Sequence, residues 1–197
     1  ASLKHAKTDL LVSVRMPAVS SRKNLHRVVE FTRAGVDLIH YVADERGYEP
    51  GVSNGLHLKD IIKEVHSALL QEGLRDEITF MASGGIAMAE HVIKSMLCGA
   101  NLVAVDVPLL IALECRVCRN CREGGGCPVH IAESDSLWGS QRIVNLMGAW
   151  HNQLLEMMGA MGIREARRLR GERGRVMFIE DLENDTFAQL FSHRDSL

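Results

Sequence analysis

The first hundred residues alternate between short apolar runs and longer segments with helical periodicity, and this alternation limits the fold more than any other feature. An apolar run without polar alternation is typical of a strand in a parallel sheet that helices cover. The amphipathic segments between such strands supply the crossovers that parallel strands need. Strands are predicted at residues 10–14, 36–42, 78–81 and 102–105, and helices at residues 23–33, 58–69 and 88–96. The sequence therefore predicts an α/β fold with about four parallel strands.

The character of the chain changes after residue 113. A cysteine-rich loop comes first, and a long helix with apolar residues at three-to-four spacing is predicted at 140–161. Shorter helices are expected at 165–169 and 181–191. The predicted organisation is a β/α part (1–113), a cysteine-rich loop (114–135) and a helical C-terminal extension (136–197).

Composition narrows the class of protein. Of the 197 residues, 46% are hydrophobic and 24% are charged, which allows a sizeable core and excludes a disordered chain. The formal net charge of −2 gives no electrostatic signature for nucleic acid or acidic membranes. No apolar signal core follows the N-terminus, and no apolar stretch approaches membrane-spanning length. We therefore expect a cytoplasmic protein with no nucleic-acid partner and no membrane.

The cysteine-rich loop carries the strongest chemical signal. Cys115, Cys118 and Cys121 follow one another at two-residue spacing, and Cys127 comes directly before Pro128. Such dense thiolate runs are typical of iron–sulfur clusters, whereas structural zinc sites usually present two separated pairs of ligands. Disulfides are disfavoured because nothing else in the chain suggests secretion. An iron–sulfur site is the preferred interpretation, and zinc stays open.

A glycine pair between a strand and a helix is the second informative motif. Ser83, Gly84 and Gly85 stand where exposed backbone N–H groups and the helix dipole favour an anion. In (β/α)8 barrels the loops after the last two strands commonly bind phosphate, so Asp106, after the last strand, would lie in the companion loop. An ordinary tight turn is the alternative interpretation of the glycine pair.

Two further residues are candidates for catalysis because barrels place functional groups at the carboxyl ends of their strands. Arg15 is expected at the end of the first strand, where it would hold a carboxylate or a flavin oxygen, or would simply be a surface arginine. Asp44 follows the second strand. His40 lies within that strand and is interpreted as a hydrogen-bonded core histidine.

The order of these motifs resembles the FMN-binding barrel of the glutamate synthase family, and in particular its stand-alone members without an amidotransferase domain. The matching segments are Ser83-Gly84-Gly85-Ile86, Gly99-Ala100, residues 102–106, 109–113, 138–142 and 161–165, and the three cysteines Cys115, Cys121 and Cys127-Pro128. The resemblance implies the C-terminal half of a (β/α)8 TIM-type barrel, with the predicted strands as strands five to eight.

The resemblance also implies a chemistry. FMN would bind with its phosphate at Ser83, Gly84 and Gly85, an iron–sulfur cluster would exchange electrons with it, and Arg15 would face flavin and substrate. Reduced FMN would deliver hydride to 2-iminoglutarate, which forms from 2-oxoglutarate and ammonia. Cys118 is extra to the family's three-cysteine run, so a [4Fe–4S] cluster is as consistent as a [3Fe–4S] cluster. Asp106 stands where the family often has glycine, which leaves the second phosphate contact open.

Half a barrel leaves open strand edges, so a partner is expected. The candidates are a complementary barrel half, a second copy of the chain or the subunits of a larger complex. The electron donor would be ferredoxin or a pyridine-nucleotide-linked subunit. Two other functions stay open: a non-catalytic iron–sulfur electron-transfer subunit, and a zinc-stapled phosphate-binding barrel protein.

Overall fold

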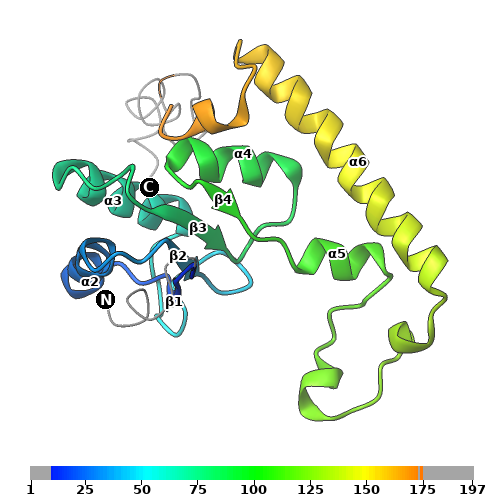
Figure 1. The fold of residues 1–197 in the computed structure, drawn as a ribbon. Helices are drawn as coiled ribbons and strands as arrows, with labels where there is room; N and C mark the ends of the chain where they lie inside the picture. The colour runs from blue at the N-terminus through cyan, green and yellow to red at the C-terminus, as the bar shows by residue number, and fades with distance from the viewer. Residues whose placement is uncertain (1–9, 173, 175–197) are drawn as a thin grey trace, which may run out of the picture.

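The computed structural model describes residues 10–172 and 174, and these residues build a parallel sheet with helices on one face (Figure 1). The strands are β1 (Ser13–Pro17), β2 (Leu38–Val42), β3 (Thr79–Ser83) and β4 (Leu102–Val103), in the order β1-β2-β3-β4. Strands that follow one another in the sequence are neighbours in the sheet, and a helical crossover joins each pair. The wall of a (β/α)8 barrel has the same arrangement. The prediction of an α/β fold with four parallel strands is confirmed.

Three helices cover the sheet: α2 (Arg22–Arg33), α3 (Leu58–Gln71) and α4 (Ala89–Cys98). Strand residues alternate between its two faces. Ile39, Tyr41 and Phe80 are fully buried on the helix side and form the centre of the main apolar core. The opposite face is open: Arg15 lies exposed on it, beside His40 in the register of β1 and β2. In a closed barrel this open face would line the interior.

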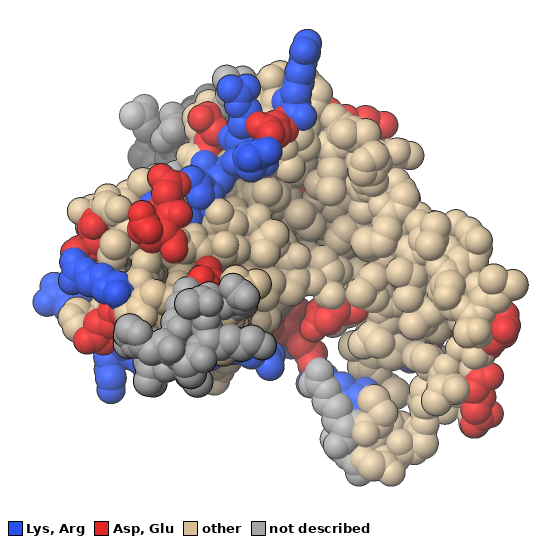
Figure 2. Space-filling model, in the orientation of Figure 1, with Lys and Arg blue, Asp and Glu red and all other residues tan. Residues whose placement is uncertain are grey.

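The chain then leaves the sheet through α5 (Val107–Ala112) and forms the cysteine-rich loop, which contains the short 3-10 helices η1 (Asn120–Glu123) and η2 (Ile131–Glu133). The chain returns along α6 (Ser136–Ala160), which packs on α4 and α5. The 3-10 helix η3 (Ala166–Leu169) follows near the end of the described residues. Figure 2 shows the cysteine-rich loop standing off the body of the molecule, with a hollow between them.

Some boundaries differ from the prediction. The first strand lies further along the chain than residues 10–14, so Arg15 falls in the middle of β1 and not at its end. The long helix begins before residue 140 because the carboxylate of Asp135 accepts the Trp138 N–H at 2.9 Å and caps it. The last short segment is 3-10 and not α-helical. The helix predicted at 181–191 lies outside the described residues.

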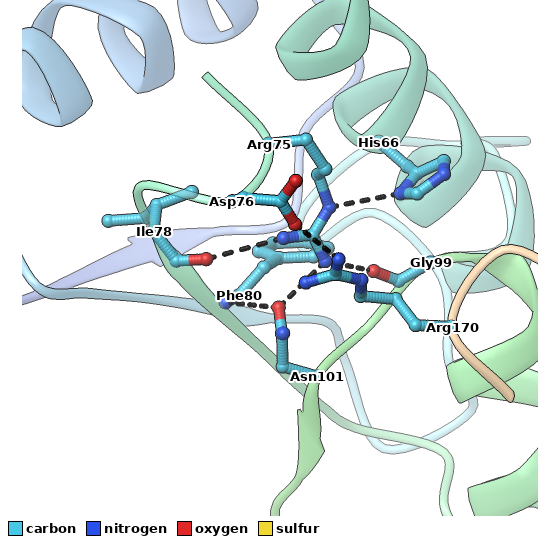
Figure 3. A network of polar contacts seen from close by, with 8 residues as sticks. All are labelled: His66, Arg75, Asp76, Ile78, Phe80, Gly99, Asn101 and Arg170. Atoms are coloured by element: carbon cyan, nitrogen blue, oxygen red, sulfur yellow. Dashed lines mark hydrogen bonds and ion pairs between the residues drawn. The ribbon is translucent and has the colours of Figure 1, made fainter. Parts of the chain in front are cut away.

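A buried arginine fixes the amino-terminal edge of the sheet (Figure 3). Arg75 is 2% exposed, and its guanidinium donates to acceptors from several elements. The acceptors are Nδ1 of His66 at 3.0 Å, the carbonyl oxygens of Ile78 at 3.2 Å and Gly99 at 2.5 Å, and Oδ1 of Asn101 at 2.7 Å. Burial, assisted by Arg170 and opposed by Asp76, lowers the pKa of Arg75 to about 10. The network links α3, the start of β3 and the end of α4.

Among the described residues, no helix has both the length and the apolar character needed to cross a bilayer.

Candidate functional site

A cavity of about 240 Å³ opens at the carboxyl ends of the strands. Arg15 and His40 contribute from β1 and β2, Ser83 ends β3 and is followed by Gly84 and Gly85, and Ala104 and Asp106 follow β4. Ligands of open and closed α/β sheets bind at this end, because the strand-to-helix loops converge there. The cavity is therefore lined by all six residues predicted to act in cofactor binding or catalysis: Arg15, Asp44, Ser83, Gly84, Gly85 and Asp106.

Arg15, His40 and Ser83 form a polar group on the open face. The register pairs Arg15 with His40 and Val42 with Ser83. Val42 lies two residues after His40 on the same face of the sheet, so Ser83 is close to His40 in the direction of the carboxyl ends of the strands. The His40 Nε2 atom is 2.7 Å from the Ser83 Oγ atom. Burial lowers the pKa of His40, and the Arg15 guanidinium lowers it further. The lowered pKa favours the neutral imidazole at pH 7.

Gly84 and Gly85 must be glycines because another backbone segment lies very close to them. Gly84 and Gly85 have φ values of 98° and 68°, which L residues with side chains rarely adopt. A Cβ on Gly84 would lie 2.5 Å from the Ala43 carbonyl oxygen, and one on Gly85 would lie 2.5 Å from the Gly47 Cα. The turn is thus packed against the loop after β2. Within the described chain, the backbone N–H groups of Gly84, Gly85 and Ile86 donate to no other group.

The acidic residues around the cavity are engaged in local contacts. Asp44 Oδ1 accepts the N–H groups of Arg46 at 2.9 Å and Tyr48 at 2.8 Å, which shapes its own loop. Asp106 Oδ1 accepts the Val107 N–H at 2.6 Å and caps α5. This bond occupies the first backbone N–H group of α5.

The cysteine-rich loop reaches back to the cavity. The Arg119 guanidinium forms an ion pair with Glu45, which lines the cavity. The contact brings the cysteine-rich loop to the rim of the site. Neither Arg119 nor Glu45 carries a sequence signal that would have paired them, because they are far apart in the chain.

The four candidate metal ligands share this loop but are not gathered at one point. Cys115 and Cys127 are half-buried, whereas Cys118 and Cys121 are exposed. In the described part of the chain, no three His, Cys, Asp or Glu side chains converge as a metal site. Two of the sulfurs nevertheless accept backbone N–H groups: Cys115 from Val117 at 3.4 Å, and Cys127 chiefly from Ile131.

The hydrogen bonds at Cys127 have a chemical effect. Hydrogen bonds from backbone N–H groups, chiefly those of Ile131 and Val129 and to a lesser extent that of His130, lower the pKa of the thiol and outweigh the opposing effects of burial and Glu133. The thiolate is the form that binds metals.

His40 lines the cavity, where sequence reasoning did not place it. The sequence predicted a hydrogen-bonded core histidine, and the hydrogen bond is present, to Ser83, but the ring lines the cavity. The available signal was the alternation of the strand: Ile39 and Tyr41 face the helices, so His40 faces the other side.

Comparison with known proteins places the chain. A family model described as the conserved region in glutamate synthase matches residues 2–164. The chain belongs to this glutamate synthase family. An archaeal glutamate synthase (NADPH) of Methanocaldococcus jannaschii is 36% identical over 129 residues, covering 62% of this chain and 25% of the relative. One of Archaeoglobus fulgidus is 29% identical over 187 residues, covering 87% of this chain and 36% of the relative.

The fold agrees with this membership. A flavocytochrome b2 with sulfite bound superposes on this chain with a TM-score of 0.58 at 15% identity. The match covers 94% of this chain and 43% of the flavocytochrome chain. A mandelate oxidase with benzoyl-formic acid gives a TM-score of 0.56 at 17% identity, covering 85% of this chain and 39% of its own. The predicted α/β fold of a partial barrel is confirmed. The chain spans between 25% and 36% of the length of the two archaeal relatives.

Proposed function

We propose that this chain is the FMN-phosphate-binding and iron–sulfur part of an oxidoreductase of glutamate synthase type. The observation that carries the proposal is the cavity at the carboxyl ends of the strands, in a chain of the glutamate synthase family. The reaction is the reductive amination of 2-oxoglutarate through 2-iminoglutarate, which yields glutamate.

The groups around the cavity suit a phosphate-bearing cofactor. Ser83 supplies a hydroxyl, the turn from Gly84 to Ile86 supplies N–H groups without a partner among the described residues, and Arg15 supplies a positive charge. The cavity of about 240 Å³ is smaller than the roughly 300–1,000 Å³ of typical ligand sites. This difference is expected if a half-barrel supplies only part of the wall.

When bound, FMN supplies the hydride that reduces 2-iminoglutarate. Arg15 is proposed to bind a carboxylate of the substrate or a carbonyl oxygen of the flavin, since guanidinium groups recognise such oxygens through paired hydrogen bonds. Asp44, oriented by the N–H groups of Arg46 and Tyr48, is proposed to accept a hydrogen bond from the substrate nitrogen. Asp106 is proposed to border the phosphate from the second loop while it caps α5.

The cysteine-rich loop is proposed to hold an iron–sulfur cluster that exchanges electrons with the flavin. Cys115, Cys121 and Cys127 form the ligand set shared with the family, and Cys118 decides between [3Fe–4S] and [4Fe–4S]. The hydrogen-bonded sulfurs of Cys115 and Cys127 support the proposal. Binding requires the ligating sulfurs to move toward a common centre, because the described loop does not gather them.

The partners follow from the open sheet face and the length of the relatives. A complementary barrel half is proposed to cover the face that carries Arg15 and His40. The electron donor is proposed to be ferredoxin or a pyridine-nucleotide-linked subunit; the archaeal relatives carry NADPH in their names. We place this assembly in the cytoplasm.

The proposal is tested by measuring glutamate formed from 2-oxoglutarate and ammonia, with dithionite as reductant, by the natively purified assembly. Arg15→Gln should reduce the rate, whereas Arg33→Gln, an exposed arginine on α2, serves as the matched control. No glutamate from an assembly that contains both FMN and a cluster would refute the reaction.

One alternative is favoured by a specific observation. The cavity is incomplete, so the half-barrel can also be the scaffold of a non-catalytic electron-transfer subunit. That function predicts a bound cluster without flavin and no glutamate formation.

A further inference from the structure

The hydrogen bond between His40 and Ser83 has no role in the function proposed so far. The two residues come from neighbouring strands and meet at 2.7 Å on the open face of the sheet, at the floor of the cavity. Ser83 is only 8% exposed and directly precedes the turn that carries Gly84 and Gly85. His40 therefore contacts the one side chain that leads into the proposed phosphate site.

The direction of this bond decides what Ser83 offers to a ligand. A neutral imidazole has one N–H group, so its Nε2 atom either donates to the hydroxyl oxygen or accepts the hydroxyl proton. If Nε2 accepts, the hydroxyl proton is occupied and the serine presents only lone pairs, which repel an anion. If Nε2–H donates, the hydroxyl proton is free to point into the cavity. An anion in the cavity therefore selects the second arrangement.

We infer that His40 is a positioning residue for phosphate: it donates its Nε2–H to Ser83 Oγ and turns the hydroxyl proton toward a phosphate monoester at the Gly84–Gly85 turn. The inference rests on the proposed FMN function and adds to it a residue within β2. The backbone N–H groups of the turn bind the same anion, so the serine hydroxyl extends their row of donors by one.

The surroundings of His40 fit this role. Arg15 lies beside it in the register and adds positive charge to the floor of the cavity. The acid groups that line the cavity are engaged elsewhere: Asp44 accepts backbone N–H groups of its own loop, Asp106 accepts the Val107 N–H, and Glu45 pairs with Arg119.

The test compares the binding of FMN and riboflavin to the full chain in its native assembly after removal of flavin, because the two ligands differ only in the phosphate. The preference for FMN over riboflavin is measured by flavin fluorescence for the wild type, Ser83→Ala, His40→Leu and the double variant. Ser83→Ala should reduce the preference about tenfold, as expected for a hydrogen bond to a charged group. His40→Leu should reduce it similarly, while riboflavin binding stays the same.

Two further variants separate positioning from packing. The double variant should lose no more than about twofold beyond Ser83→Ala, because both changes remove one interaction. His40→Gln keeps an N–H donor and should restore much of the FMN preference. His26→Leu, the same substitution at an exposed position on α2, is the control and should change nothing.

Several results would overturn the inference. They are an unchanged FMN preference in His40→Leu, an equal loss of FMN and riboflavin binding, or additive losses in the double variant. A wild-type assembly that binds neither flavin would refute the proposed function itself, and the inference with it. Circular dichroism of each variant distinguishes lost binding from lost folding, and His40→Gln carries the test if His40→Leu does not fold.

Discussion

Replacing Arg75 with methionine should destabilise the fold more than any other single arginine change among those considered. Methionine fills the space of the aliphatic stem but removes the donors to His66, Ile78, Gly99 and Asn101. At about 1 kcal/mol of net stabilisation for each hydrogen bond, the four bonds contribute about 4 kcal/mol.

Urea unfolding followed by far-ultraviolet circular dichroism measures this loss. With a slope of about 2 kcal/mol per molar urea, the midpoint should fall by about 2 M. Such a loss is a large part of a typical stability of about 5–15 kcal/mol. Arg33→Met is the matched control: its ion pair with Glu72 is exposed, so it should cost less than about 1 kcal/mol. An equally small effect of Arg75→Met would show that the network in Figure 3 does not stabilise the fold.

Three further predictions concern the sheet and the cavity. Gly85→Ala should destabilise the fold and abolish FMN binding, because the added Cβ would lie 2.5 Å from backbone atoms. The control Gly35→Ala, also at positive φ but with open space around it, should cost only about 1 kcal/mol. Equal unfolding midpoints of the two variants would contradict this prediction. Arg15→Gln should raise the pKa of His40, since the guanidinium adds to the effect of burial; the shift is read by NMR titration of the imidazole, and a fall would contradict the assignment. Tyr41→Phe should leave the unfolding free energy the same or raise it, because the buried Tyr41 hydroxyl has no hydrogen-bond partner among the residues that the structure describes; a loss above about 1 kcal/mol in urea unfolding would reveal one.

The strand–helix alternation predicted the sheet well because each crossover helix has its own apolar face and its own end signals. The N-cap is an example: Ser21 accepts the Asn24 N–H at 3.1 Å, and helix α2 begins at the following residue. The first strand was placed too early because Leu10 and Leu11 are apolar but exposed, whereas β1 runs on to Pro17. Proline is tolerated as the last residue of β1, which has only one paired neighbour among the described strands.

The site was predictable where local backbone chemistry creates it, and not where strand pairing creates it. Two adjacent glycines after a strand indicate the turn at Gly84 and Gly85. The contact between His40 and Ser83 depends on the register of β2 and β3, which no local pattern shows. The burial of Arg75 was likewise hidden, because a charged residue between two elements is usually exposed.

The cofactor content of the natively and anaerobically purified assembly tests the central claim most directly. The account predicts flavin and iron–sulfur absorption in the visible spectrum, release of FMN on denaturation, and iron with acid-labile sulfide that is lost in Cys127→Ser. Stoichiometric zinc, with neither iron nor flavin, would contradict it.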